Sequence, residues 1–265
     1  MTDTLNTILL GVIEGITEFL PISSTGHLLI AEKWLGERSE LFNVAIQAGA
    51  ILAIVLIYWR RLTTLITGFA QPANRDYALK LIAAFLITAG LGFIVTHMGF
   101  KLKDAIVPIA VAEVLGGVLI LVIEAYVAKK PQLGTLTWSV AIWVGLCQIL
   151  AGVFPGTSRS AATIFAAMLA GLTLRPAATE FAFLVGIPTM FAATGYEYWK
   201  NRHGTGMPED WNALAIGFVV SGIVAFIAVK WLLRYVQSHR FTLFAWYRIV
   251  LGAALFAMVG AGIVS

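Results

Sequence analysis

The same polar turn occurs twice in this chain, each time inside a hydrophobic stretch. The first copy, here the first elbow, covers residues 11–27, and the second elbow covers residues 145–163. A shift of 134 positions places Pro21 on Pro155 and aligns the leading glycine of each copy. Together the elbows contain two glutamates, a histidine, an arginine and a row of hydroxyls. Because ionisable groups at membrane depth are costly, the elbows predict a functional site.

The composition of the whole chain indicates a polytopic helical membrane protein. Of the 265 residues, 59% are hydrophobic and only 12% are charged. Several apolar runs approach the roughly 20 residues that cross a bilayer. These runs are continuous and lack the period-two alternation of a β-barrel strand.

Charge and cysteine usage exclude other classes. The net charge of +4 is spread over the loops and forms no basic stripe, so we expect no nucleic-acid partner. The lone Cys147 excludes an internal disulfide and a cysteine metal cage. Since the first basic residue is Lys33, a cleavable signal peptide is not expected either.

Hydrophobic stretches divide the chain into two comparable halves, about 1–130 and about 131–265, within one integral membrane domain covering 1–265. The first half contains Leu5–Leu20 with Ser24–Leu35, Phe42–Trp59, Leu81–Thr96 and Pro108–Tyr126. The second half contains Trp138–Phe154 with Ser160–Leu172, Phe181–Trp199, Ala213–Leu232 and Leu243–Val264.

The first stretch of each half is interrupted by a proline, and each of its arms is too short to span a bilayer comfortably. We expect two re-entrant helical hairpins and six transmembrane helices; one kinked helix per half is the alternative. A hairpin plus three spans inverts the second half relative to the first, which is the pattern of inverted repeats with a site at their interface. The distribution of Lys and Arg favours both termini outside.

The first elbow combines carboxylates, hydroxyls and an imidazole. Glu14 and Glu18 are four residues apart and share a helical face, which suits a divalent cation such as Mg²⁺ or Ca²⁺. A proton-relay or structural pair is the alternative. Ser24 and His27 are three apart, as an activated nucleophile and its base would be. His27 could instead bond a neighbouring helix. For Ser23, capping of the next helix is favoured.

The second elbow supplies an anion cradle. Gly156 allows close backbone approach, and the residues after it open a helix whose positive end can receive an anion. Arg159 adds a planar fork for phosphate oxygens, although an ion pair with Glu14 or Glu18 is the alternative. Thr163 lies on the face of Arg159. The two elbows together favour phosphoryl transfer on a lipid phosphate.

Residues 14–27 and 155–163 resemble the two signature motifs of bacterial undecaprenyl-diphosphate phosphatases, the bacitracin-resistance family. The similarity runs along the whole chain and includes residues 47–49 and 58–61. It implies hydrolysis of undecaprenyl diphosphate, recycling of the carrier lipid for peptidoglycan and the cell wall, and bacitracin resistance. It further implies a multi-pass protein of the bacterial inner membrane, with a site that opens to the periplasm and uses Mg²⁺ or Ca²⁺.

The resemblance also assigns the site residues, which are Glu14, Glu18, Ser24, His27, Ser158, Arg159 and Thr163. We expect Ser24 to attack the terminal phosphorus and His27 to handle its proton. Glu18 with Glu14 would hold the metal or position water, and Arg159 with Ser158 and Thr163 would stabilise the phosphoryl oxygens. A phosphoenzyme on His27 is the competing mechanism.

A secondary transporter or lipid flippase is the alternative function, because inverted repeats with broken helices are also transporter architecture. Chain-length preference, oligomeric state, including a homodimer, and lipid flipping stay open. Four further polar residues in or beside spans are expected to form interhelical pairs or reach the interface: Glu113, Glu124, Glu180 and Arg248.

Overall fold

A computed structural model describes residues 2–99, 105–203 and 209–262, and every regular element in these ranges is an α-helix. The helices are α1 (Thr2–Thr17), α2 (Ser24–Leu35), α3 (Glu40–Ile57), α4 (Trp59–Thr67), α5 (Pro72–His97), α6 (Ile106–Val127), α7 (Trp138–Val153), α8 (Arg159–Leu169), α9 (Arg175–His203), α10 (Trp211–Ser238) and α11 (Thr242–Gly260).

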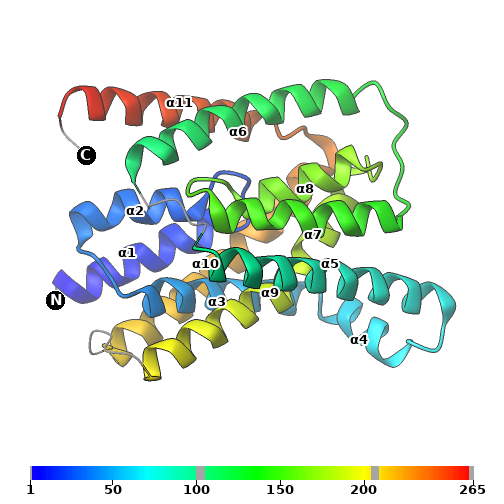
Figure 1. Cartoon of the computed structure of the whole chain (residues 1–265), viewed down its shortest axis with the longest axis horizontal. Coiled ribbons are helices and arrows are strands. Elements are labelled where there is room, and N and C mark those ends of the chain that lie inside the picture. Colours follow the sequence, from blue (N-terminus) through cyan, green and yellow to red (C-terminus); the bar gives the residue numbers. More distant parts are fainter. Residues whose placement is uncertain (1, 100–104, 204–208, 263–265) are drawn as a thin grey trace.

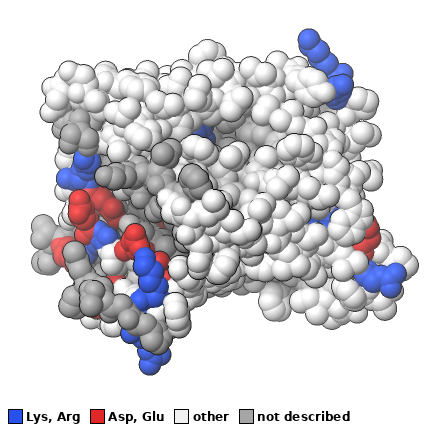
Figure 2. All heavy atoms as spheres, in the orientation of Figure 1, with Lys and Arg blue, Asp and Glu red and all other residues white. Residues whose placement is uncertain are grey.

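Six helices are long and apolar enough to cross a membrane, as the sequence predicts: α3, α5, α6, α9, α10 and α11. Figure 2 shows the charged side chains mainly at the two ends of the molecule, with a broad, almost uncharged band between them. This distribution fits a multi-pass membrane protein, because charged side chains avoid the hydrocarbon region.

The ends of some spanning helices differ from the ends of the hydrophobic stretches that predicted them. Helices α5 and α9 begin at Pro72 and Arg175, well before the apolar residues that mark them in the sequence. In α5 the polar first turns are stabilised by an ion pair between Lys80 and Asp76, 2.5 Å apart. The amphipathic helix α4 was not predicted; it follows α3 directly after Tyr58. Hydrophobicity alone therefore underestimates helix length.

The remaining four helices form two short pairs, α1 with α2 and α7 with α8, whose members pack against each other. Their lengths, 16, 12, 16 and 11 residues, are below that of a spanning helix. Figure 1 shows both connecting turns near the middle of the molecule. The Ser160 hydroxyl donates a 3.0 Å hydrogen bond to the Leu20 carbonyl, so the second elbow is joined to the first.

Long helices hold each pair in place. Helix α10 packs on α1 and α3, α5 packs on α7, and α6 packs on α11, as Figure 1 also shows for the last pair. Helix α1 packs very closely on α10 at Gly15. A Cβ at this position would come within 2.7 Å of the Ser221 carbonyl oxygen, so the close packing requires glycine. The elbows are thus enclosed by helices from both halves of the chain.

Candidate active site

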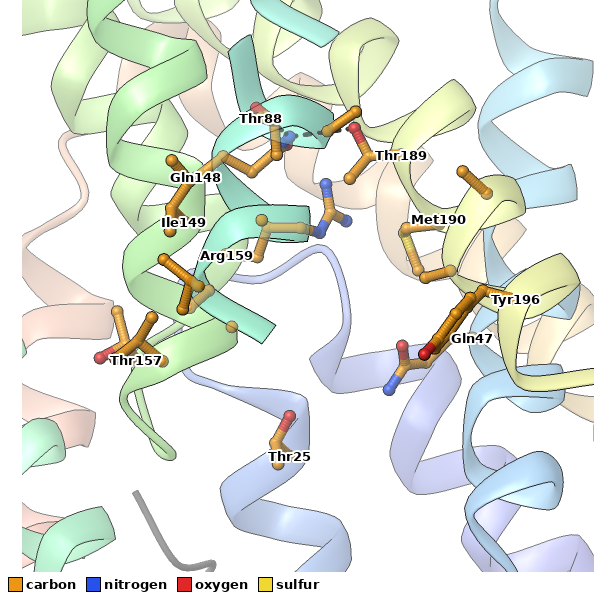
Figure 3. A pocket seen from close by; sticks show the side chains of 18 of the residues that line it. Thr25, Gln47, Thr88, Gln148, Ile149, Thr157, Arg159, Thr189, Met190 and Tyr196 are labelled. Atoms are coloured by element: carbon orange, nitrogen blue, oxygen red, sulfur yellow. Dashed lines mark hydrogen bonds between the residues drawn. The ribbon is translucent and has the colours of Figure 1, made fainter. Parts of the chain in front are cut away.

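A cavity of about 500 Å³ lies where the two elbows meet α5 and α9. The elbows contribute polar side chains to its wall, among them Glu18, Ser24, Ser158 and Arg159. Helix α5 contributes mainly apolar ones, including Phe85 and Phe93. Figure 3 shows the Arg159 side chain extending into the space between the helices. The cavity therefore offers a polar end beside an apolar wall.

Glu18 connects the two elbows at the polar end. Ser24 Oγ donates a 2.5 Å hydrogen bond to Glu18 Oε2, and Arg159 Nη2 donates a 2.8 Å hydrogen bond to Glu18 Oε1. The structure thus contains an Arg159–Glu18 ion pair, the contact named as the alternative for Arg159, while phosphate binding by Arg159 stays a prediction. Its second amino group, Nη1, is buried without a hydrogen-bond partner and remains available for another acceptor. The carboxylate can accept the proton of Ser24 while the guanidinium compensates its charge.

Local backbone geometry sets the position of Ser24. Ser23 has φ 67° and is the only non-glycine residue with positive φ in the described part of the chain. Its side chain accepts from Gly26 N at the start of α2, so the predicted cap is confirmed. The chain reverses here, and Ser24 at the first position of α2 faces back toward Glu18. A strained residue of this kind persists only where its surroundings hold it.

The predicted pairing of Ser24 with His27 is wrong. His27 Nδ1 lies 2.7 Å from the Ser23 carbonyl oxygen, and Nε2 lies 2.6 Å from Tyr247 Oη on α11. With both nitrogens engaged, His27 holds the elbow backbone and reaches a neighbouring helix, which was the alternative. Ser24 instead bonds Glu18, because the chain reversal turns its hydroxyl toward α1.

The second elbow is also only partly as predicted. Ser158 lines the cavity and caps α8 through Ala161 N. Thr163, however, is fully buried and bonds the carbonyl oxygens of its own helix. Gly156, at φ 83°, lies against α6, where a Cβ would come within 2.8 Å of Ile109 Cα. Neither Gly156 nor Thr163 is part of the cavity wall, so the geometry does not support their predicted contacts with phosphate.

Glu14 is the buried carboxylate without a visible role. It is 0% exposed, and neither oxygen has a hydrogen-bond partner. It interacts electrostatically with Glu18 and Arg159. A cluster of three metal-ligating side chains is absent from the described residues. Glu14 does not line the cavity itself but lies against Glu18, which does. Mg²⁺ is commonly held by one or two carboxylates plus water and substrate phosphates, so Glu18 together with Glu14 fits a divalent cation.

Arg248 and Glu113 form a buried ion pair, 3.0 Å between Nε and Oε2, as expected for interhelical residues. The sequence did not indicate their connection to the elbows. Arg248 donates to the Pro21 carbonyl at 3.3 Å and to the Gly156 carbonyl at 3.1 Å. One side chain of α11 thus contacts the turn of each elbow. Only the chemistry of proline-interrupted helices, which leaves carbonyl groups unpaired, could have suggested it.

We expect Arg248→Met to lower the free energy of unfolding by about 3 kcal/mol, because it leaves Glu113 buried without a cation. Thermal unfolding in detergent measures the loss, with the exposed Arg234→Met as a control for removal of one arginine. Adding Glu113→Gln to Arg248→Met should recover part of the stability. Equal melting temperatures of the Arg248 and Arg234 variants would contradict a stabilising role of the Arg248–Glu113 ion pair.

Comparison with known proteins agrees with these features. The model of the family described as bacitracin resistance protein BacA matches residues 7–254. An undecaprenyl-diphosphatase of Rhizobium etli is 62% identical over 99% of this chain and 100% of its own length. The undecaprenyl-diphosphatase of Xanthomonas euvesicatoria is 56% identical, covering 96% of this chain and 97% of its own.

Proposed function

The chain belongs to the bacitracin resistance protein BacA family and is a membrane-bound undecaprenyl-diphosphatase, and we propose that the cavity between its elbows carries out the hydrolysis. The substrate is undecaprenyl diphosphate, and the products are undecaprenyl phosphate and phosphate. The activity would recycle the carrier lipid for cell-wall synthesis and so counter bacitracin. The observation that carries the proposal is the hydrogen-bonded series from Ser24 through Glu18 to Arg159.

We assign the nucleophile to Ser24 and its base to Glu18. Ser24 Oγ forms a bond to the terminal phosphorus, and the bond to the bridging oxygen breaks. The proton passes to Glu18 and then to the departing undecaprenyl phosphate. Water next attacks the phosphoserine, the bond to Ser24 Oγ breaks, and the hydroxyl regains a proton. This assignment replaces the proton-transfer role first expected for His27, because Glu18 lies within 2.5 Å of the serine oxygen.

Arg159 is assigned to the charge on the phosphoryl oxygens. Its Nη1 has no partner in the structure, so it can bind one oxygen while Nη2 keeps Glu18 in place. The amides that open α2 and α8 add partial positive charge on the same side. Ser158 lines this end as well. The positive groups stabilise the transition state because they are fixed before substrate arrives.

A divalent cation, Mg²⁺ or Ca²⁺, would be held by Glu14 and Glu18, and when bound it would neutralise diphosphate charge. The orphaned, fully buried Glu14 supports this assignment. We expect a chelator to reduce phosphate release to background and either cation to restore it. Release is measured from undecaprenyl diphosphate in detergent. Undiminished activity of chelated, metal-free protein would remove the cation from the proposal.

We further propose that α1–α2 and α7–α8 are re-entrant hairpins in two inverted repeats. Their short arms and central turns support this arrangement, as does the packing of α1 on α10 and α7 on α5, helices in matching positions of the two halves. The cavity would open toward the periplasm, as first predicted from the resemblance. A single domain and a homodimer also stay predictions; light scattering of the purified protein tests the dimer.

The direct test of the function measures phosphate release by purified protein in detergent, where no gradient exists. Hydrolysis should proceed in the wild type and fall to background in Ser24→Ala. A transporter or flippase, the alternative, needs no phosphate release at all. Binding of the lipid by the wild-type protein without hydrolysis would overturn the proposal. Full activity of Ser24→Ala would overturn only the assignment of the nucleophile.

A further inference from the structure

Gln148 on α7 occupies the position that corresponds to Glu14 in the first elbow. It is 4% exposed and lines the cavity. Its Nε2 donates 3.0 Å hydrogen bonds to Thr88 Oγ1 on α5 and to Thr189 Oγ1 on α9. Figure 3 shows the amide between these two threonines, with the Arg159 guanidinium below it. The side chain is therefore held from both sides beside the proposed phosphate-binding arginine.

Hydrogen-bond directions indicate which end of the amide the two threonines hold. The single hydroxyl hydrogen of Thr88 is directed to the Ala84 and Gly145 carbonyl oxygens, which lie at similar distances. Thr189 donates its hydroxyl hydrogen to the Val185 carbonyl. With their own hydrogens directed to these carbonyls, both hydroxyls accept from Gln148, and the two hydrogens of Nε2 are used. A flipped amide would place two acceptors against acceptors. Oε1 is then the end of the amide that the threonines do not hold.

The Oε1 atom is buried and has no hydrogen-bond partner. An acceptor left unpaired inside a protein is destabilising unless a ligand supplies the missing hydrogen. Arg159 Nη1, in the same cavity wall, is likewise an unpaired donor. Nη1 carries two hydrogens, so one can bind a phosphoryl oxygen and the other a small group that also donates to Oε1. An unprotonated phosphate oxygen cannot supply the hydrogen that Oε1 lacks. Water has this chemistry.

We infer that Gln148 is a positioning residue that orients the hydrolytic water of the second half-reaction. Its Oε1 accepts one hydrogen of the water, which turns the oxygen lone pair toward the phosphorus. The water oxygen then forms the new bond to phosphorus while the bond to Ser24 Oγ breaks. The hydroxyl is transferred to the phosphate and the remaining proton returns to Ser24. Gln148 itself neither gains nor loses a proton.

The inference rests on the proposed function, and the test separates their failures. Purified full-length protein is mixed with undecaprenyl diphosphate and quenched rapidly, and undecaprenyl phosphate and inorganic phosphate are measured separately. In Gln148→Leu we expect a burst of about one undecaprenyl phosphate per protein, with phosphate formation slowed by about 10- to 100-fold. Both products should vanish in Ser24→Ala.

Two matched threonine variants guard against misfolding of the Gln148 variant. Thr189→Val removes one acceptor that holds the amide and should slow phosphate formation to a rate between those of wild type and Gln148→Leu. Thr194 is not part of the cavity wall, and its hydroxyl bonds the carbonyls of Val44 and Met190. Thr194→Val removes this α9 hydroxyl and should leave the product ratio unchanged.

Three results decide between the inference and its premise. Equal slowing of both products in Gln148→Leu, or no slowing, overturns the role of Gln148 when Ser24→Ala is inactive. A raised KM with unchanged kcat overturns it too, because Gln148 would then bind substrate. If Ser24→Ala forms both products at the wild-type rate, the assigned nucleophile fails, and the positioning of water during phosphoserine hydrolysis fails with it.

Discussion

Glu18→Gln should lower kcat for phosphate release by about a thousandfold, the middle of the range for loss of a general base. The amide can still accept the Ser24 hydrogen bond, yet it cannot take the proton. The substitution also removes the only carboxylate within ion-pair distance of Arg159 among the described residues. Steady-state kinetics in detergent measure the effect, with KM changing far less than kcat.

Glu37→Gln is the matched control, because it removes one carboxylate from an exposed position between α2 and α3. It should hydrolyse at the wild-type rate. A Glu18→Gln protein that retains more than about a tenth of the wild-type kcat would contradict the role of Glu18 as the base, because general-base catalysis contributes at least about a hundredfold.

Arg159→Met is expected to lower kcat by at least about a thousandfold, as removal of a transition-state arginine does in other phosphoryl transfers. Two causes combine. The phosphoryl oxygens lose the free Nη1 donor, and Glu18 loses its 2.8 Å partner inside a buried site. Arg159→Lys should recover only part of the rate, since one ammonium group does not reproduce two separated amino groups.

Kinetics of the double variant test whether these residues act as a unit. If Glu18 and Arg159 serve one site, Glu18→Gln with Arg159→Met should be hardly slower than either single variant. Independent roles would instead multiply the two losses. Arg60→Met, which removes an exposed arginine of α4, is the control for the change in charge. A loss in the double variant equal to the product of the two single losses would contradict a shared site.

The membrane-spanning architecture was predictable because apolar runs of spanning length have few alternatives in a bilayer. The two elbows stood out for the same reason, since polar residues within such runs need a compensating role. The ends of α5 and the whole of α4 were not predictable from hydropathy. Polar residues there form helix through local ion pairs and the amphipathic pattern, for which hydropathy carries no signal.

Within the candidate site, the sequence predicted Ser24, Glu18 and Arg159, which the structure brings together, but it paired Ser24 with the wrong partner. Spacing on an ideal helix brings Ser24 and His27 together. The positive φ of Ser23 instead reverses the chain, so the serine faces the preceding helix. Such a dihedral is rare for a non-glycine residue and has no sequence signature.

Contacts between distant helices were beyond sequence spacing altogether. Arg248 lies 227 positions from Pro21 and 92 from Gly156, yet it bonds the carbonyl of each. The Gln148 amide depends in the same way on threonines from α5 and α9. Both arrangements follow from the packing of helices of the two halves around the elbows.

Identification of the residue that carries the phosphoryl group tests the central claim most directly. Gln148→Leu protein is quenched after mixing with undecaprenyl diphosphate labelled in the terminal phosphate, and the labelled peptide is located by mass spectrometry. We predict a phosphate ester on Ser24, stable in acid, and no label in the Ser24→Ala protein. An acid-labile label on His27, or label that persists without Ser24, would contradict the mechanism.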